Sequence, residues 1–165
     1  MSGDAAAERI PEGESRAVAA LDASGLRYRL TRHGPVRSLE EAAAARRVKP
    51  DQVVKTLVVR RGEDDFLFVL VPGGRQISWP KLRALLDVSR LSMPDAATAL
   101  AVTGYERGTI TPFGSTHAWP VIADARVAGR PMSIGAGTHG AAATLDGSQL
   151  VKALGATVAD VTDPE

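Results

Sequence analysis

Residues 53–59 combine a pronounced hydrophobic pattern with a single charged side chain. Valine, leucine and threonine occupy both alternating faces of this stretch, which predicts a strand buried on both sides in the middle of a sheet. Lys55 shares one of these faces with Val53 and Leu57. Its ammonium either reaches water along its apolar stem or points into a pocket that holds a negative group. The strand alone leaves both interpretations open.

A second two-sided apolar run at residues 66–71 follows a polar stretch at 62–65. The polar stretch has the composition of a turn, so the two runs predict an antiparallel hairpin that holds most of the core. Alternating or apolar segments predict further strands at 26–30, 132–134, 141–145 and 157–161, and a short strand at 88–91 is a weaker expectation.

Capping residues before helically spaced apolar residues, and glycines after them, predict the helices. These are expected at 14–24, from 38 to about 47, from 78 to about 86, from 95 to 103 and from 146 to 154. In the third helix the pattern places Leu82, Leu85 and Leu86 on one side. In the fourth it turns the following residues inward: Ala96, Ala97, Leu100 and Ala101.

Composition limits the possible functions. The 165 residues suit one domain that buries roughly two-thirds or more of its unfolded surface, with a loose tail at 1–13 and the domain at 14–165. The formal net charge of +1 provides no global field for nucleic acid, so any contact with RNA must be local. The absence of cysteine excludes disulfides, a cysteine nucleophile and thiolate metal sites. The three histidines lack helical zinc-site spacing, and we expect neither metal nor cofactor.

The sequence contains no apolar run near the ~20 residues that a membrane span needs, and we expect a soluble, cytoplasmic protein. Nucleophile elbow, Walker and Rossmann motifs are also absent. What remains is the amine of Lys55 and two glycine-rich segments, 104–114 and 135–140. Their backbone N–H groups can hold an anion or a developing oxyanion. Taken singly, each segment is equally well read as a plain turn.

In this order the residues resemble the YbaK/EbsC family, relatives of the editing domain inserted in bacterial prolyl-tRNA synthetases. The resemblance runs from about Gly25 to Val161. It is carried by the residues 54–58 around Lys55, by 103–105 with Gly108 and 112–114, by 122–124, by the 137–140 turn and by the closing 150–161 segment.

The resemblance implies a single compact α/β domain with a mixed, largely antiparallel central sheet flanked by short helices. It implies an aminoacyl-tRNA deacylase that acts in trans and hydrolyses the ester of a mischarged tRNA without a protein nucleophile or metal. Lys55 would be the catalytic residue. The substrate-binding residues would be Thr56, Gly104, Tyr105, Gly108, Pro112, Phe113, Gly114, Gly137, Thr138, His139 and Gly140. The expected partners are the 3′-terminal adenosine and amino acid of an aminoacyl-tRNA and, as a second candidate, an aminoacyl-tRNA synthetase.

Departures from the family pattern keep other functions open. Some relatives carry basic residues where this chain has Thr138 and His139, and a glycine where it has Ala136. A catalytically silent module that binds a tRNA end, a nucleotide or a protein is therefore the alternative, and a hydrolase of small esters is a third reading. Capping of the following turn is the simpler role for Asp124, and His33 and His117 are taken as ordinary surface or turn residues.

Overall fold

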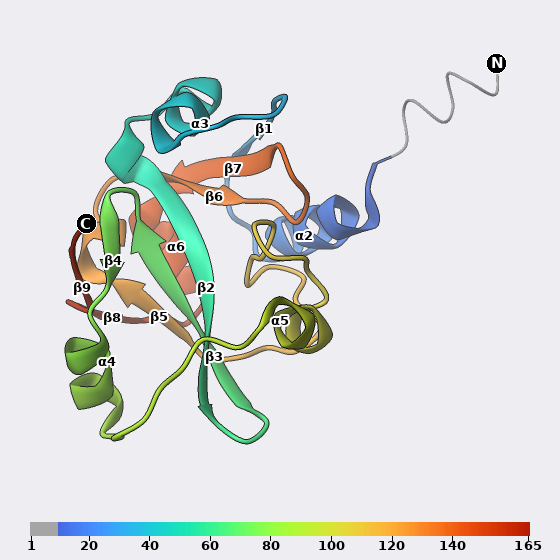
Figure 1. Cartoon of the computed structure of the whole chain (residues 1–165). Coiled ribbons are helices and arrows are strands. Elements are labelled where there is room, and N and C mark those ends of the chain that lie inside the picture. The colour runs from blue at the N-terminus through green and yellow to red at the C-terminus, as the bar shows by residue number, and fades with distance from the viewer. Residues whose placement is uncertain (1–9) are drawn as a thin grey trace, which may run out of the picture.

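A computed structural model describes residues 10–165, which form a mixed sheet of seven strands, a separate two-stranded sheet and short helices (Figure 1). The large sheet has the strand order β1-β7-β6-β2-β3-β5-β8. Its strands are β1 (Arg29–Arg32), β2 (Val53–Gly62), β3 (Asp65–Pro72), β5 (Val121–Asp124), β6 (Pro131–Gly135), β7 (Ala141–Asp146) and β8 (Thr157–Ala159). The small sheet pairs β4 (Arg75–Ile77) with β9 (Thr162–Pro164).

The sheet is mixed, as the resemblance implies. Antiparallel pairing joins β1 to β7, β7 to β6 and β2 to β3. Parallel pairing joins β2 to β6, β3 to β5 and β5 to β8. The antiparallel ladders are the longer ones, so the predicted single α/β domain with a mixed, largely antiparallel sheet is confirmed.

The hairpin of β2 and β3 forms the centre of the sheet, as its two-sided apolar pattern predicts. Every residue of 66–71 is buried. One hydrophobic core lies on the face of Val58 and Phe68, and a second lies on the face of Val59 and Val69. A strand with a core on each side has no wet face, which explains why the sequence of β3 does not alternate.

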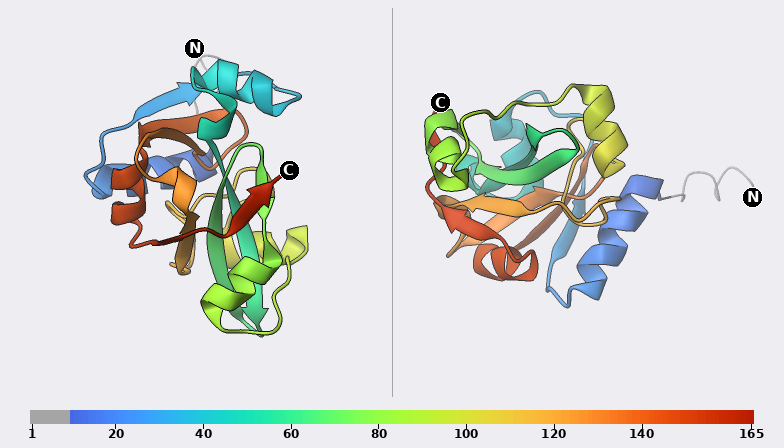
Figure 2. Two further views of the ribbon diagram at one scale, coloured as in Figure 1. Left: turned by 90° about the vertical axis from the view of Figure 1, so that its left-hand side faces the viewer. Right: turned by 90° about the horizontal axis from the view of Figure 1, so that it is seen from below.

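Helices cover both faces of the sheet (Figure 2). Leu21 of α2 and Leu150 of α6 join the first core, and Leu82 of α4 joins the second. The helices are α2 (Glu12–Ala23), α3 (Leu39–Arg46), α4 (Trp79–Leu86), α5 (Ala96–Thr103) and α6 (Gly147–Ala153), with short 3-10 turns η1 (Pro50–Gln52) and η2 (Ala125–Val127).

The predicted caps form in four of these helices. The side chains of Ser38, Ser78, Asp95 and Asp146 each accept a hydrogen bond from the backbone N–H three residues later. Such a bond satisfies one of the free N–H groups of the first helical turn. Helix starts were predictable because this chemistry is local.

Several other sequence-based expectations are wrong. The strand expected at 26–30 begins only at Arg29, and residues 88–91 contribute no strand beside the isolated bridge of Arg60 with Ser92. The stretch 157–161 gives β8 as Thr157–Ala159 only, and the sequence analysis missed β4, β5 and β9. Of the expected tail at 1–13, residues 1–9 lie outside the described residues and Glu12 already opens α2.

The inward face of α5 is also not the predicted one. Ala99 and Thr103 are buried, whereas the four residues expected inside are exposed: Ala96, Ala97, Leu100 and Ala101. In α4, Leu85 is likewise exposed. Apolar residues on all sides of a short alanine-rich helix leave its orientation undetermined, so packing decides which side turns inward.

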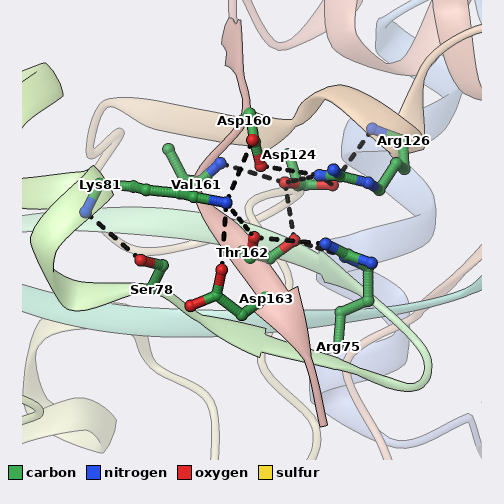
Figure 3. A network of polar contacts seen from close by, with 9 residues as sticks. All are labelled: Arg75, Ser78, Lys81, Asp124, Arg126, Asp160, Val161, Thr162 and Asp163. Carbon is green, nitrogen blue, oxygen red and sulfur yellow. Dashed lines mark hydrogen bonds and ion pairs between the residues drawn. The ribbon is translucent and has the colours of Figure 1, made fainter.

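The buried carboxylate of Asp124 fixes the C-terminal segment to the sheet (Figure 3). Its Oδ1 accepts hydrogen bonds from the Val161 backbone N–H at 3.2 Å and from Thr162 Oγ1 at 2.9 Å. Arg126 pairs with it at 3.1 Å and with Asp160 at 2.8 Å. Hydrogen bonds from Arg126 and then Lys81 lower the pKa of Asp160 to about 2. Asp124 also accepts from the Arg126 N–H, which is the predicted capping role.

We expect Asp124→Ala to destabilise the protein by about 3 kcal/mol, because it leaves buried donors of Val161 and Thr162 without an acceptor. The measurement is the free energy of unfolding in urea. Asp163→Ala is the matched control, because Asp163 makes only an exposed ion pair with Lys81. Equal loss in the two variants would contradict the role given to Asp124.

Candidate active site

A cavity of about 320 Å³ opens beside β2, at the point where its neighbour β6 ends. β6 pairs with β2 only at Val53 and Val54, whereas β3 follows β2 along nearly its whole length. Beyond Val54 the free edge of β2 therefore faces the cavity. The wall is completed by the end of α3, the start of α5 and the 104–114 loop, and its residues are Arg46, Val53, Val54, Lys55, Thr56, Leu57, Val58, Met93, Pro94, Ala96, Ala99, Arg107, Gly108, Ile110 and Gly135.

Lys55 is one of the residues that line this cavity. Its side chain is 46% exposed, and Nζ is 3.4 Å from Oε1 of Glu165, which is itself exposed and does not line the cavity. The structure therefore combines the two readings of the strand pattern: the side chain reaches water, and it does so beside a cavity and with a negative partner. An ion pair between two half-exposed side chains contributes little to stability. A ligand that offers a better negative group can therefore replace Glu165 at low cost.

Thr56 follows Lys55 in the same wall. Its Oγ1 is buried and has no hydrogen-bond partner among the described residues. A buried hydroxyl without a partner loses the hydrogen bonds that water would give it. Since a hydroxyl both donates and accepts, Thr56 can bind either kind of polar group that enters the cavity.

Arg16 of α2 holds the 104–114 loop in place. Its Nη2 donates to the Gly104 carbonyl at 2.7 Å, its Nε donates to the Gly114 carbonyl at 3.3 Å, and its guanidinium carbon lies 4.6 Å from the centre of the Tyr105 ring. Tyr105 is buried, and its hydroxyl donates to the Phe113 carbonyl at 2.7 Å. The loop is thus closed across its base.

The 137–140 turn packs directly against this loop. A Cβ added at Gly108 would lie 3.3 Å from His139 Cε1, and one added at Gly137 would lie 2.9 Å from Tyr105 Cε1 and overlap the Gly13 carbonyl. Gly137 also has a φ of +86°. The two glycine-rich segments therefore meet because a glycine on each leaves room for a side chain of the other, His139 against Gly108 and Tyr105 against Gly137.

The structure divides the predicted site residues between two hollows. Lys55, Thr56 and Gly108 share the cavity beside β2. A second hollow of about 270 Å³ lies on the other side of the contact between loop and turn, and it is lined by Gly104, Tyr105, Gly137, Thr138 and His139, with residues of α2 and α5. Gly137 therefore does not border the Lys55 cavity; Gly135, two residues earlier, does.

The remaining predicted residues surround and support these hollows. Phe113 is buried, Pro112 and Gly114 are half-buried, and Gly140 accepts a hydrogen bond from the His33 backbone N–H at 2.8 Å. His117 stacks on Trp119 with ring centres 5.2 Å apart. Burial raises the pKa of the Tyr105 hydroxyl. Tyr105 and Phe113 thus act as structural supports of the loop.

Sequence reasoning missed the two arginines in the cavity wall, Arg46 and Arg107, and the anchoring Arg16. In the sequence, Arg46 is simply a basic residue near a helix end, which is where such residues commonly lie. No spacing or motif separates these arginines from those on the surface. Their roles depend on contacts between segments far apart in the sequence, such as the bond from Arg46 Nη1 to the Ser133 carbonyl at 3.3 Å.

Within residues 10–165, no group of three or more histidine, cysteine, aspartate or glutamate side chains is arranged to hold a metal ion. In the same range, every helix is too short or too polar to cross a membrane.

Residues 33–153 match the family model described as "Aminoacyl-tRNA editing domain", and the chain belongs to that family. Among curated proteins it is similar to proline–tRNA ligase of Thermosipho africanus (36% identity over 80 residues) and of Kosmotoga olearia (33% over 89 residues). These matches cover 48% and 54% of this chain but only 14% and 15% of the ligases.

Solved structures confirm the fold. "Hypothetical protein APE2540" superposes with a TM-score of 0.81 at 27% identity, covering 90% of this chain and 99% of that one. "A putative trans-editing enzyme for prolyl tRNA synthetase" gives a TM-score of 0.85 at 24% identity, covering 94% and 99% of the two chains.

We expect Gly137→Ala to destabilise the protein by about 3 kcal/mol or more, because the methyl group would meet Gly13 and Tyr105 in addition to the strain of positive φ. Gly129→Ala is the matched control: Gly129 has a φ of +88° but no atom within 4 Å of an added Cβ, so only the strain of about 1 kcal/mol applies. Urea unfolding of both variants measures the difference, and equal values would show that the turn does not pack as described.

Proposed function

We propose that this protein is a trans-acting aminoacyl-tRNA deacylase, which hydrolyses the ester of a mischarged tRNA. The observation that carries the proposal is that Lys55, Thr56 and Gly108 line one cavity in a chain of the aminoacyl-tRNA editing family. Such an enzyme works where tRNA is charged, in the cytoplasm. Its substrate is the 3′ end of an aminoacyl-tRNA, and an aminoacyl-tRNA synthetase is a candidate partner.

The reaction needs a water oxygen to attack the ester carbonyl carbon, after which the bond to the ribose oxygen breaks and that oxygen takes a proton. Negative charge develops on the carbonyl oxygen during the attack. In this proposal Lys55 stabilises the charge; the support is that Lys55 lines the cavity and that its ammonium pairs only with the exposed Glu165 among the described residues. The hydroxyl of Thr56, which has no partner among the described residues, offers a further hydrogen bond to the substrate.

The described cavity wall contains no carboxylate or imidazole to act as a general base. An aminoacyl ester is an activated substrate, so positioning of the water and stabilisation of the oxyanion supply much of the rate. In line with the family resemblance, a hydroxyl of the terminal ribose or the side chain of the amino acid assists the attack. The rigid loop around Gly108 then fixes the ester against Lys55.

The direct test is a panel of mischarged tRNAs. The similar curated proteins are proline–tRNA ligases. The first substrates to test are therefore proline tRNAs charged with amino acids other than proline. Release of an amino acid well above the uncatalysed rate supports the proposal. Well-folded protein that releases none from any member of the panel contradicts it.

Lys55→Ala is expected to lower kcat/KM on the best substrate about a hundredfold, the loss typical of one missing oxyanion donor. The urea midpoint should stay unchanged, because the ion pair with Glu165 is exposed. Lys152→Ala, which removes an exposed lysine of α6, is the control for a general loss of positive charge. Full activity of Lys55→Ala would remove this residue from the mechanism.

The absence of a base in the wall also favours a second function, a module that binds a tRNA end without cleaving it. Binding of a non-hydrolysable aminoacyl-adenosine analogue, together with no turnover of any charged tRNA, would identify this function. Equal cleavage of simple amino-acid esters and of charged tRNA would instead indicate a hydrolase of small esters.

A further inference from the structure

Arg46 is a partly buried cation at the end of α3, in the wall of the cavity beside β2. Its Nη1 donates to the Ser133 carbonyl at 3.3 Å. Its Nε is buried and has no hydrogen-bond partner among the described residues. The guanidinium therefore enters the protein with much of its hydrogen-bonding capacity unused.

No carboxylate within residues 10–165 lies close enough to Arg46 to form an ion pair, whereas other arginines do have such partners: Arg16, Arg32, Arg61, Arg126 and Arg130. Burial lowers the pKa of Arg46, since desolvation disfavours the charged form. An arginine nonetheless stays protonated near neutral pH. A desolvated cation without an anionic partner is costly to the fold, and a bound anion would remove that cost.

The charge of the cavity wall has one sign. Arg46, Lys55 and Arg107 are its charged residues within the described chain, and all three are basic. Lys55 already has Glu165 as a partner. Most of the other lining residues are apolar or small, so the wall consists of an apolar surface with a cationic group set into it.

An aminoacyl-tRNA offers one kind of anion near its reactive end. The ester carries an ammonium and hydroxyl groups, and the nearest negative charge is the phosphodiester that joins the terminal nucleoside to the preceding nucleotide. A planar guanidinium is well suited to bind two phosphate oxygens at once. We propose that Arg46 binds this terminal phosphate and so orients the nucleoside in the cavity, an inference that rests on the proposed function.

Binding of AMP and of adenosine to the intact protein, measured by calorimetry, tests the assignment without any hydrolysis. The wild type should bind AMP about tenfold to a hundredfold more tightly than adenosine. Arg46→Gln should abolish this preference. Arg47→Gln is the matched control, because Arg47 is the next residue, is exposed and does not line the cavity. An unchanged preference in Arg46→Gln, or no preference in the wild type, overturns the proposal.

Stability separates ligand binding from a structural role. Arg46→Gln removes a desolvated charge, so its thermal midpoint should equal or exceed that of the wild type. Arg46→Lys keeps a cation and should retain part of the preference for AMP. A lowered midpoint in Arg46→Gln, with loss of binding that is equal for AMP and adenosine, would show that Arg46 serves the fold instead.

Two ester substrates then connect the residue to the reaction. For hydrolysis of aminoacyl-tRNA, Arg46→Gln should lower kcat/KM at least tenfold. For the same amino acid esterified to adenosine, which lacks the phosphate, it should change kcat/KM little; an equal loss on both substrates overturns the assignment. A wild type that hydrolyses neither substrate contradicts the proposed function, while the comparison of AMP with adenosine still decides the role of Arg46.

Discussion

The short pairing between β2 and β6 is the constraint that creates the candidate site. β6 follows β2 for two residue pairs and then leaves it, while β3 continues alongside β2. A third full-length strand would have filled this space and used the backbone groups of β2. Because it is missing, the sheet has an open edge at its centre, next to cores on both faces. A cavity in that position is backed on one side by the central hairpin, the most deeply buried part of the sheet.

The glycine-rich segments fix the path of the chain after β6 separates from β2. After Gly135 the chain turns through Gly137 and Gly140, both with positive φ, and packs against the 104–114 loop. Arg16 and Tyr105 hold that loop from the opposite side. These contacts link α2, the loop and the turn into one unit. The turn therefore contributes to the cavity by fixing Gly108, although Gly137 itself faces the second hollow.

Sequence reasoning succeeded where local chemistry determines the structure. The hairpin of β2 and β3 follows from two apolar runs around a polar turn, and helix starts such as that at Ser38 follow from their caps. It failed where distant segments decide. β4 and β9 are short strands that gain their partners only when the middle of the chain meets its C-terminal segment. The same limit applies to the site. Lys55 can be recognised in the sequence because it interrupts an apolar strand, whereas Arg46 cannot, because it lies at a helix end, where basic residues are common.

The proposed RNA-end ligand has to be reconciled with a net charge of only +1. Long-range steering is weak for such a protein, so selectivity must come from groups that act at contact. A cation inside a wall of apolar residues interacts more strongly with an anion than one in water, because the local dielectric is lower. An unpaired cation in such a wall is disfavoured for the same reason, and Arg46 has a buried Nε without a partner among the described residues. An anion bound beside Arg46 would offset that cost, so the burial of one charge would favour an anionic ligand over a neutral one of the same shape.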